Sequence, residues 1–526
     1  MTGEGPAVAG RLSVSLRIGA TGHRWLDPTD QVLVDTVRTA LDGLRSACTV
    51  SSTPTTDVGL TVISSLAEGA DRIIAEVALS MGAVLEVVLP LAVEDFVTDF
   101  ADDASRLRFK QLLAQAESVT TVPGNPARPD AYADSGEMVV QRCDALLALW
   151  DGRPSRGKGG TAEVVDTAGG AAKPVAWVAV APPGVEAAPL IKQMPREIVV
   201  LGPKAFASLD RYNTQSVPID VKAAPPEGFP QEGVISDFVL PYFLRADRVA
   251  TRRQVWFRRL SIAIYAFSVV AISAPAANLA YWHGEKEFLT WIELAFLLLI
   301  IAVLLLGRRT LLLERWLAAR FLAERLRSLA FLAELSADDS PQLTPPDTTH
   351  VTASDEWRDR AMSELSIRTP HPDVDMRVLF RTVRARLSEE WLRPQARYHA
   401  KVSATAWRRH RQFKWIAIGL FTVSVLAAIS HLVGPSKPEH EYPAFVALVA
   451  PIIGAAFSGY SAQRDYTRVA LRSEGMIRTL NSAITDVAST STLDDLRGVA
   501  QRTDIVMQGE SVDWYFAARL REPEVP

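Results

Sequence analysis

The sequence predicts an α/β domain with a parallel sheet, followed by an α-helical membrane domain of four spans built of two repeated hairpin units. Two observations predict this combination. In the first third of the chain, short apolar runs alternate with amphipathic helical patterns, which is typical of a parallel sheet covered on both faces. Further along, residues 260–282, 288–306, 415–433 and 442–462 are almost continuously apolar. At about 1.5 Å of rise per residue, each stretch can cross a hydrocarbon core about 30 Å thick.

Six apolar runs are the expected strands of the sheet. They are residues 12–18, 58–63, 84–89, 119–122, 145–150 and 174–180. Helical patterns separate them, and residues 198–201 could add one more strand. In sheets of this kind, ligands bind beyond the carboxyl ends of the strands. The residues that follow these runs are therefore the expected place for a binding site.

Motifs rich in glycine and charged residues follow three of the predicted strands. Glycines at a strand-to-helix turn let backbone N–H groups approach a phosphate closely, and a helix N-terminus adds partial positive charge. The expected ligand-binding residues are Gly19, Thr21, Gly22, His23 and Arg24 after the first strand, Ser65, Glu68, Gly69, Asp71 and Arg72 after the second, and Asp151, Gly157, Lys158, Gly159, Gly160, Thr161 and Glu163 after the fifth.

The charged residues of these motifs suit a nucleotide. Arg24, Arg72 and Lys158 are expected to neutralise phosphate charge, while Glu68, Asp71 or Glu163 would bind ribose hydroxyls. Two alternatives stay open at this point. The glycines can simply make turns, and the two acids after the second strand can complement the dipole of the helix that follows.

The motif Gly-Lys-Gly-Gly-Thr-Ala-Glu at residues 157–163 resembles the glycine–Thr–x–Glu signature of the SLOG superfamily. This group of Rossmann-like nucleotide-binding domains includes the lysine decarboxylase-like phosphoribohydrolases, and the resemblance covers residues 12–182. The enzymes carry Pro-Gly-Gly-x-Gly-Thr-x-x-Glu. Here Arg156 replaces the proline, and Glu163 lies one residue closer to Thr161. The departure argues against hydrolase chemistry more than against ligand binding.

Arginine and lysine flank both pairs of apolar stretches. Positive residues mark the cytoplasmic side of a membrane because they resist translocation. Both hairpins are therefore expected to point outward from an inner (cell) membrane, with the N-terminus and the C-terminus in the cytoplasm. The flanking residues are Arg252, Arg253, Arg258, Arg259, Arg308, Arg309 and Arg315 around the first pair, and Arg408, Arg409, Arg411, Lys414, Arg464, Arg468 and Arg472 around the second.

The two membrane hairpins have similar flanks. Residues 257–264 parallel residues 412–418 ahead of each hairpin, and residues 317–327 parallel residues 466–478 behind it. Each unit is thus a basic helix, a hairpin and a charged amphipathic helix. This arrangement resembles the SLATT family, two-span modules that occur beside SLOG sensors in bacterial conflict systems. The alternative is two unrelated anchors that look alike because juxtamembrane helices are generally basic.

These patterns divide the chain into five segments. Residues 1–182 form the SLOG-like domain, 183–238 a linker with a possible extra strand, 239–335 the first hairpin unit, 336–375 a second linker, and 376–526 the second hairpin unit. Hydrophobic residues make up 48% of the chain and charged residues 22%, so globular segments must balance lipid-facing ones. Cys48 and Cys143 are the only cysteines. Because both are expected in the cytoplasm, no disulfide is expected, and a zinc cluster is excluded.

Taken together, the resemblances imply a membrane effector. The SLOG-like domain would bind a nucleotide-derived signalling ligand and gate or assemble a channel or pore in the lipid bilayer, in bacterial antiphage or conflict signalling. Four spans are too few to enclose a wide pore, so a homo-oligomer is expected. Gly454, Ala455, Ser458 and Gly459 offer a small-residue face for close helix contact. We expect no nucleic-acid partner, no metal and no other cofactor.

Glu293 is the candidate pore residue, because an acidic side chain inside a span is costly unless it faces water or a partner. Snorkelling of Glu293 to the outer headgroups is the alternative. Two other functions remain open for the whole chain. One is a membrane-tethered hydrolase of nucleotide N-glycosidic bonds, with Glu163 and Arg72 as catalytic residues. The other is a membrane-anchored scaffold. The altered signature favours a ligand sensor over an enzyme.

Overall fold

The computed structural model describes residues 9–124, 127–155, 157–220, 224–282, 284–335, 356–370, 376–433 and 441–519. The chain forms two compact units. The sheet unit comprises Met1–Ser216 together with Ser336–Pro372, and the helical unit comprises Val217–Leu335 together with Asp373–Pro526. Each unit is therefore discontinuous in sequence, and each is considered separately below.

A seven-stranded sheet in the order β4-β3-β2-β1-β5-β6-β7 is the centre of the sheet unit. All pairings from β4 to β6 are parallel, and β7 runs antiparallel to β6. The predicted parallel sheet is thus confirmed, and each of the six apolar runs contributes a strand. The strands are β1 (Val14–Gly22), β2 (Val58–Ser64), β3 (Val84–Leu89), β4 (Ser118–Thr121), β5 (Ala145–Trp150), β6 (Val175–Ala179) and β7 (Leu190–Gln193).

The sheet differs from the prediction at two places. Strand β7 has no apolar run, because it is an edge strand whose Leu190 is 61% exposed. Residues 198–201, the expected extra strand, form only an isolated bridge between Cys48 and Ile198. Strand β1 also continues through the first glycine motif as far as Gly22, because residues 18–22 pair with β5.

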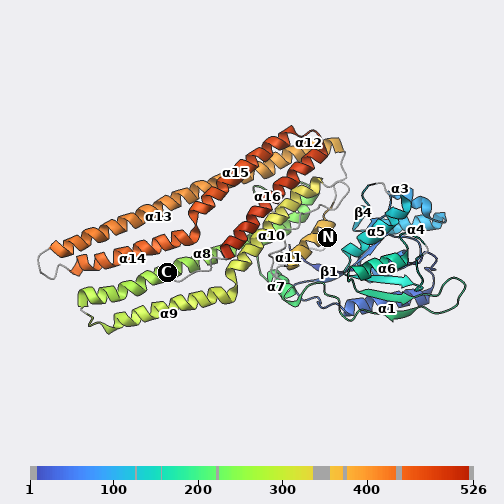
Figure 1. Cartoon of the computed structure of the whole chain (residues 1–526), viewed down its shortest axis with the longest axis horizontal. Helices are drawn as coiled ribbons and strands as arrows, with labels where there is room; N and C mark the ends of the chain where they lie inside the picture. The colour runs from blue at the N-terminus through green and yellow to red at the C-terminus, as the bar shows by residue number, and fades with distance from the viewer. Residues whose placement is uncertain are drawn as a thin grey trace. The chain divides into compact units, whose positions relative to one another are not determined.

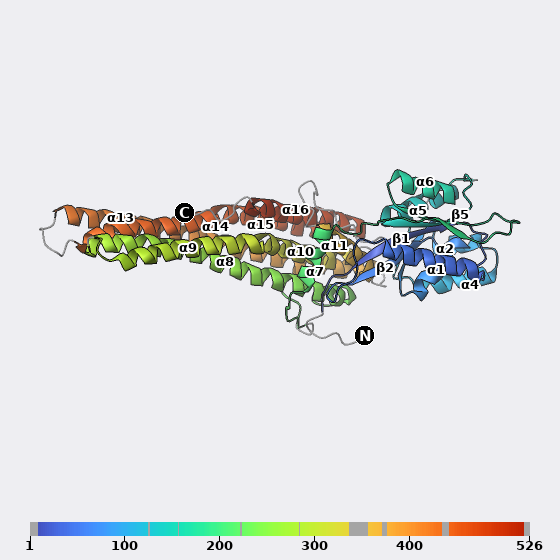
Figure 2. The same cartoon turned by 90° about the horizontal axis from the view of Figure 1, so that it is seen from below.

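Helices cover both faces of the sheet. Helices α1 (Gln31–Ser46) and α2 (Ala70–Ser80) lie on one face, while α5 (Arg128–Arg142) and α6 (Thr161–Gly170) lie on the other (Figure 2). The carboxylate of Asp30 accepts the amides of Val32 and Leu33 and caps α1, as expected at a helix N-terminus. The short segments α3 (Val93–Phe96) and η1 (Val97–Asp99) and helix α4 (Asp103–Leu113) join β3 to β4.

The strand order creates a topological switch point between β1 and β5. From β1 the chain builds outward through β2 and β3 to β4, then returns to place β5 on the other side of β1. Helices that cover opposite faces leave a crevice beyond the carboxyl ends of two such strands. The first and third sequence motifs lie at the carboxyl ends of β1 and β5, so the topology brings them together at this switch point.

Two more helices complete the sheet unit, and both fall in segments that were expected to be linkers. Helix α7 (Pro203–Asn213) is tied to the start of the sheet, since the Asn213 amide donates to the Leu12 carbonyl at 2.7 Å. Helix α11 (Glu356–Arg368) comes from the segment between the two membrane hairpins. Trp357 on α11 is buried against Tyr212 of α7, with ring centroids 5.3 Å apart.

A network of charged groups binds α11 to the first strand. The Arg360 guanidinium donates to both carboxylate oxygens of Asp144, at 2.8 and 2.6 Å, and to the Ser15 carbonyl at 2.6 Å. One turn later, the Glu364 carboxylate accepts the backbone amide of Ser15 at 2.9 Å. Hydrogen bonds between charged groups are stronger than neutral ones. Residues 336–375 are therefore not only a linker, since α11 is part of the sheet unit; residues 336–355 and 371–375 lie outside the described residues.

The helical unit contains the four helices that are long and apolar enough to cross a membrane, among the residues that the structure describes. The predicted four-span helical region is confirmed to this extent. Helices α8 (Val234–Trp282) and α9 (Glu287–Thr310) form one antiparallel hairpin, and α13 (Arg393–Val433) and α14 (Glu441–Arg464) form the other (Figure 1). Where α14 passes α8, a Cβ on Gly459 would lie 2.9 Å from the Tyr265 ring. Where α14 passes α13, a Cβ on Gly454 would lie 3.6 Å from Leu420.

The second helix of each hairpin ends at a single residue with left-handed backbone. Leu311, with φ of 47°, separates α9 from α10 (Leu312–Leu332), and Asp465, with φ of 44°, separates α14 from α15 (Tyr466–Ser489). Such a residue redirects the chain at the end of a helix. The remaining elements of the unit are η2 (Ala333–Leu335), α12 (Met376–Arg386), the π-helical turn η4 (Leu387–Leu392) and α16 (Leu493–Arg519).

Replacing Arg360 with alanine should release α11 from the sheet unit. The change leaves the Asp144 and Glu364 carboxylates without their guanidinium partner, which costs about 3 kcal/mol for a buried pair. Amide hydrogen exchange of α11 in the full-length protein should then accelerate roughly a hundredfold.

Arg368→Ala is the matched control on the same helix. Arg368 is 3.3 Å from Glu117, and both side chains are largely exposed, so its loss costs under about 1 kcal/mol. Equal acceleration in the two variants would show that the Arg360 network does not hold α11.

Candidate functional site

The first and third sequence motifs meet beyond the carboxyl ends of β1 and β5. Nε2 of His23 lies 3.0 Å from Oδ1 of Asp151 and 3.1 Å from the Asp151 backbone nitrogen. A neutral Nε2 accepts the backbone N–H, whereas a protonated one donates to the carboxylate. Burial opposes ionisation of Asp151, but hydrogen bonds from the Arg153 amide and from His23 outweigh it and hold the pKa of Asp151 below its usual value. The switch point therefore holds an ionised carboxylate beside the His23 ring.

The second motif closes on the first through its glycine. Gly69 has φ of 75°, and a Cβ there would collide with the carbonyl oxygens of His23 and Arg24. Only glycine fits a left-handed position this close to another backbone. The next residue, Ala70, donates its N–H to the His23 carbonyl at 3.1 Å. Gly22 is equally confined, since a Cβ there would collide with Ala70. These two glycines therefore allow the first and second motifs to come into close contact.

Exposed aromatic and cationic groups line the same region. Trp25 is 43% exposed and stacks on His23, with centroids 5.1 Å apart and an interplanar angle of 20°. The exposed Arg24 guanidinium lies 4.9 Å from the centroid of the Tyr132 ring, a cation–π distance. The Tyr132 hydroxyl donates to Asp99. Trp25, Tyr132 and Asp99 were not among the predicted site residues. Trp25 directly follows the first motif, which is the only local signal in the sequence for any of them.

The third motif forms the entry to α6. The Glu163 carboxylate accepts the amide of Gly159 at 2.5 Å, and the Lys158 ammonium pairs with Asp130 of α5. Gly160 is the N-cap of α6 and provides no side-chain cap, and Thr161 is the first helical residue. The helix begins with uncapped backbone N–H groups, which favour anions. Gly157 is exposed, and Arg156 lies outside the described residues.

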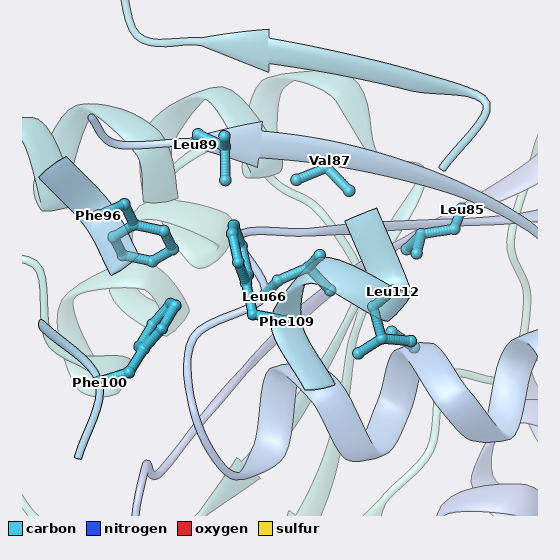
Figure 3. Close-up of a cluster of buried hydrophobic side chains, with 9 residues drawn as sticks. Leu66, Leu85, Val87, Leu89, Phe96, Phe100, Phe109 and Leu112 are labelled. Atoms are coloured by element: carbon cyan, nitrogen blue, oxygen red, sulfur yellow. The ribbon is translucent and has the colours of Figure 1, made fainter. Parts of the chain in front are cut away.

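Two charged residues of the second motif, Arg72 and Glu68, bond to the segment that leads into α4. The Arg72 guanidinium is buried, donates to the Leu66 carbonyl at 3.0 Å and to Ser105, and lies 4.4 Å from the centroid of the Phe100 ring. Phe100 belongs to the cluster of buried hydrophobic side chains in Figure 3. The Glu68 carboxylate accepts the Ala101 amide at 3.0 Å and the Ser105 hydroxyl. This geometry does not support phosphate binding by Arg72 or ribose binding by Glu68, because both side chains hold the entry to α4.

Asp71, the third charged residue of the second motif, is buried. Burial raises the pKa of its carboxyl to about 7, against the opposing effects of Arg24 and of the backbone amides of Ala67 and Ser65. The carboxyl accepts hydrogen bonds from the turn that contains Ser65 and Ala67. It is only 6% exposed, which does not favour contact with a ribose. Ser65 itself lies nearby, with its hydroxyl 2.7 Å from that of Ser135.

The structure thus gathers part of the predicted set. Gly22, His23, Arg24, Gly69 and Asp151 meet at the switch point. The loop at residues 157–160 lies beside the same aromatic residue as Arg24, since a Cβ on Gly159 would contact Tyr132. Gly19 and Thr21 lie within β1. Glu163 and Arg72, the alternative catalytic pair, engage separate partners. No group of three metal-ligating side chains occurs in the described part of the chain.

Comparison with known proteins assigns no family to this chain. No family model matches the chain, and no curated protein matches it.

The raised pKa of Asp71 predicts a specific pH dependence of stability. The folded-state pKa, about 7, is above the unfolded value of about 3.9, so the folded protein holds this proton more tightly. The resulting stabilisation is present below about pH 4 and is lost as the pH rises to about 7. Thermal unfolding followed by tryptophan fluorescence should show this loss in the wild type, and Asp71→Asn should remove it.

Asp42→Asn changes an exposed carboxylate on α1 and is the control. Its melting temperature should follow the wild-type pH profile. If Asp71→Asn follows that profile as well, Asp71 does not take up the proton.

Proposed function

We propose that this chain is a membrane effector whose sheet unit is a SLOG-like sensor of a nucleotide-derived ligand. Ligand binding beyond β1 and β5 controls a channel or pore that copies of the helical unit form in the cell membrane. This is the arrangement of bacterial antiphage or conflict signalling. The observation that carries the proposal is the meeting of His23, Asp151 and Gly69 at the switch point of a parallel sheet. Ligands bind α/β sheets at this position.

The groups near the switch point suit the parts of a nucleotide. Bases stack on aromatic faces, and Trp25 presents an exposed ring backed by His23. Phosphates bind helix N-termini and guanidinium groups; the uncapped start of α6 and the exposed Arg24 provide both. A phosphate at Arg24 would also weaken the electrostatic support that Arg24 gives to the ionised form of Asp71.

The path of the chain supports transmission between the units. The chain passes from one unit to the other after Ser216, after Leu335 and after Pro372. Helix α11 belongs to the sheet unit, yet both of its neighbours in sequence belong to the helical unit. A ligand that prefers one arrangement of the sheet unit shifts the whole protein toward it. The segments on either side of α11 join the two units covalently, and in this proposal they transmit the change of arrangement.

The helical unit is a tandem SLATT-like module in this proposal. In support, α9 and α14 each have 24 residues, end at a left-handed residue and continue into a further helix, of 21 residues in α10 and 24 in α15. Gly454 and Gly459 already pack against α13 and α8 of the same chain, so oligomer contacts use other faces. Glu293 on α9 is half-buried, and it is the residue proposed to lie along the conduction path.

The proposed topology places both ends of the chain in the cytoplasm, because the arginine flanks resist translocation. A cysteine at Gly284, in the turn between α8 and α9, should react with a membrane-impermeant maleimide applied to intact cells. A cysteine at the exposed Ser489 should react only after lysis. Cys48 and Cys143 are first replaced by serine and alanine. Labelling of the Ser489 variant in intact cells would invert the topology.

Ligand binding is tested on the full-length protein with ADP-ribose and cyclic oligonucleotides as probes. Arg24→Ala and Trp25→Ala should each weaken binding at least about tenfold, since a charge-assisted hydrogen bond or a stacked base contributes about 1–3 kcal/mol. Titration calorimetry measures the change in Kd.

Arg45→Ala is the control, because Arg45 is exposed near the end of α1, at the opposite edge of the sheet. Equal affinity in all three variants would move the site elsewhere. Release of a free base during the titration would instead favour the hydrolase.

A further inference from the structure

A cavity of about 710 Å³ lies within the helical unit. Helices α8, α10, α13, α15 and α16 all contribute side chains, so both hairpin units form its walls. Part of the lining is apolar and includes Trp316, Phe321 and Met476. The rest is strongly basic, with Arg320, Lys401, Arg409, Arg464 and Arg472 against one carboxylate, Glu324.

The single carboxylate is already neutralised. Oε1 of Glu324 lies 2.5 Å from Nη2 of Arg320, and the carboxylate also pairs with Arg327. These arginines overcome the effect of burial and lower the pKa of Glu324. Among the described residues, no carboxylate pairs with Lys401, Arg409, Arg464 or Arg472. The cavity therefore carries an excess of positive charge.

A smaller cavity of about 210 Å³ adjoins the first and shares Gln254, Arg409, Arg464 and Tyr466 with it. It adds Arg258, so arginines from α8, α13 and α14 converge there. Arg258 lies just before the first predicted span and Arg409 before the third. Arg464 lies just after the fourth. The convergence is thus at the basic end of the membrane-spanning segments.

We propose that Arg258, Arg409 and Arg464 bind the phosphate of an anionic phospholipid, whose headgroup occupies the paired cavities. The three guanidinium groups line one cavity, where an anion would relieve their mutual repulsion, although water partly screens the exposed Arg258 and Arg409. Basic pockets between membrane helices on the cytoplasmic side bind anionic headgroups. The three arginines lie at the ends of the spans, where a lipid phosphate sits with its acyl chains in the bilayer, which favours a lipid over a free phosphate.

The bound lipid would stabilise the packing of the two hairpins. Arg258 belongs to the first hairpin, and Arg409 and Arg464 belong to the second, so one phosphate bridges them. A ligand that binds only the packed arrangement stabilises it by mass action. The inference rests on the proposed membrane insertion, but it does not depend on the nucleotide site of the sheet unit.

The test compares full-length protein in nanodiscs of phosphatidylcholine with and without phosphatidylglycerol. The anionic lipid should raise the melting temperature of the wild type by at least about 2 °C. This shift should be lost in the triple variant Arg258→Gln, Arg409→Gln, Arg464→Gln. Native mass spectrometry should show retained phosphatidylglycerol on the wild type and none on the variant. If the triple variant fails to fold, Arg409→Gln alone should reduce both signals.

The matched control removes the same charge from the same juxtamembrane region. Arg408, Arg411 and Lys414 are exposed on α13 and line neither cavity. The variant Arg408→Gln, Arg411→Gln, Lys414→Gln should keep the shift and the bound lipid. Equal loss in both triple variants would show only general attraction to an anionic surface and overturn the proposal.

A third arm separates the two sources of phosphate. Inorganic phosphate and ATP are added to wild-type protein in phosphatidylcholine nanodiscs. Neither should reproduce the shift given by phosphatidylglycerol. If either does, and Arg409→Gln removes the effect, the cavity takes a soluble phosphate and the lipid proposal is wrong. A cysteine at Leu298, within α9 and exposed on the helix surface, should resist a water-soluble maleimide in the same samples when the span is inserted, so a failure of insertion is distinguished from a failure of lipid binding.

Discussion

The attachment of α11 to the first strand determines how this chain is divided. Arg360 places one guanidinium between Asp144, the Ser15 carbonyl and Glu364, and burial makes these charges costly to separate. Because α11 lies between the two hairpins in sequence, this one ion-pair network makes both units discontinuous. The two units are therefore joined covalently on both sides of α11 as well as after Ser216.

The strands and spans were predictable because their signals are local. A parallel strand buried on both faces needs an uninterrupted apolar run, and a membrane helix needs a long one. The elements that were missed depend on distant partners. Leu190–Gln193 is an exposed edge strand that pairs only with β6. Helix α11 follows polar residues and is positioned by hydrogen bonds to Ser15 of β1 and to Asp144, which directly precedes β5.

The same reasoning explains why the structure brings together some of the predicted site residues and not others. His23, Gly69 and Asp151 meet because strand order brings strand ends together, and strand order follows from alternating apolar runs. Arg24 and Arg72 are alike in sequence, each following a glycine motif. Only the packing of Phe100 and Ser105 around Arg72 shows that it is structural. The same distinction applies in the helical unit, where Arg320 is paired, whereas Arg258 and Arg409 line a cavity without a carboxylate partner among the described residues.

The discontinuity of the sheet unit also sets an order of events during synthesis. The ribosome releases the chain from its N-terminus, and domains fold as they emerge. All seven strands leave the ribosome before the first hairpin, but α11 follows that hairpin. Asp144 and Ser15 therefore remain without Arg360 until two spans have been translated. The start of β1 therefore stays without α11 until the first hairpin has been synthesised, so completion of the sheet unit waits for that hairpin.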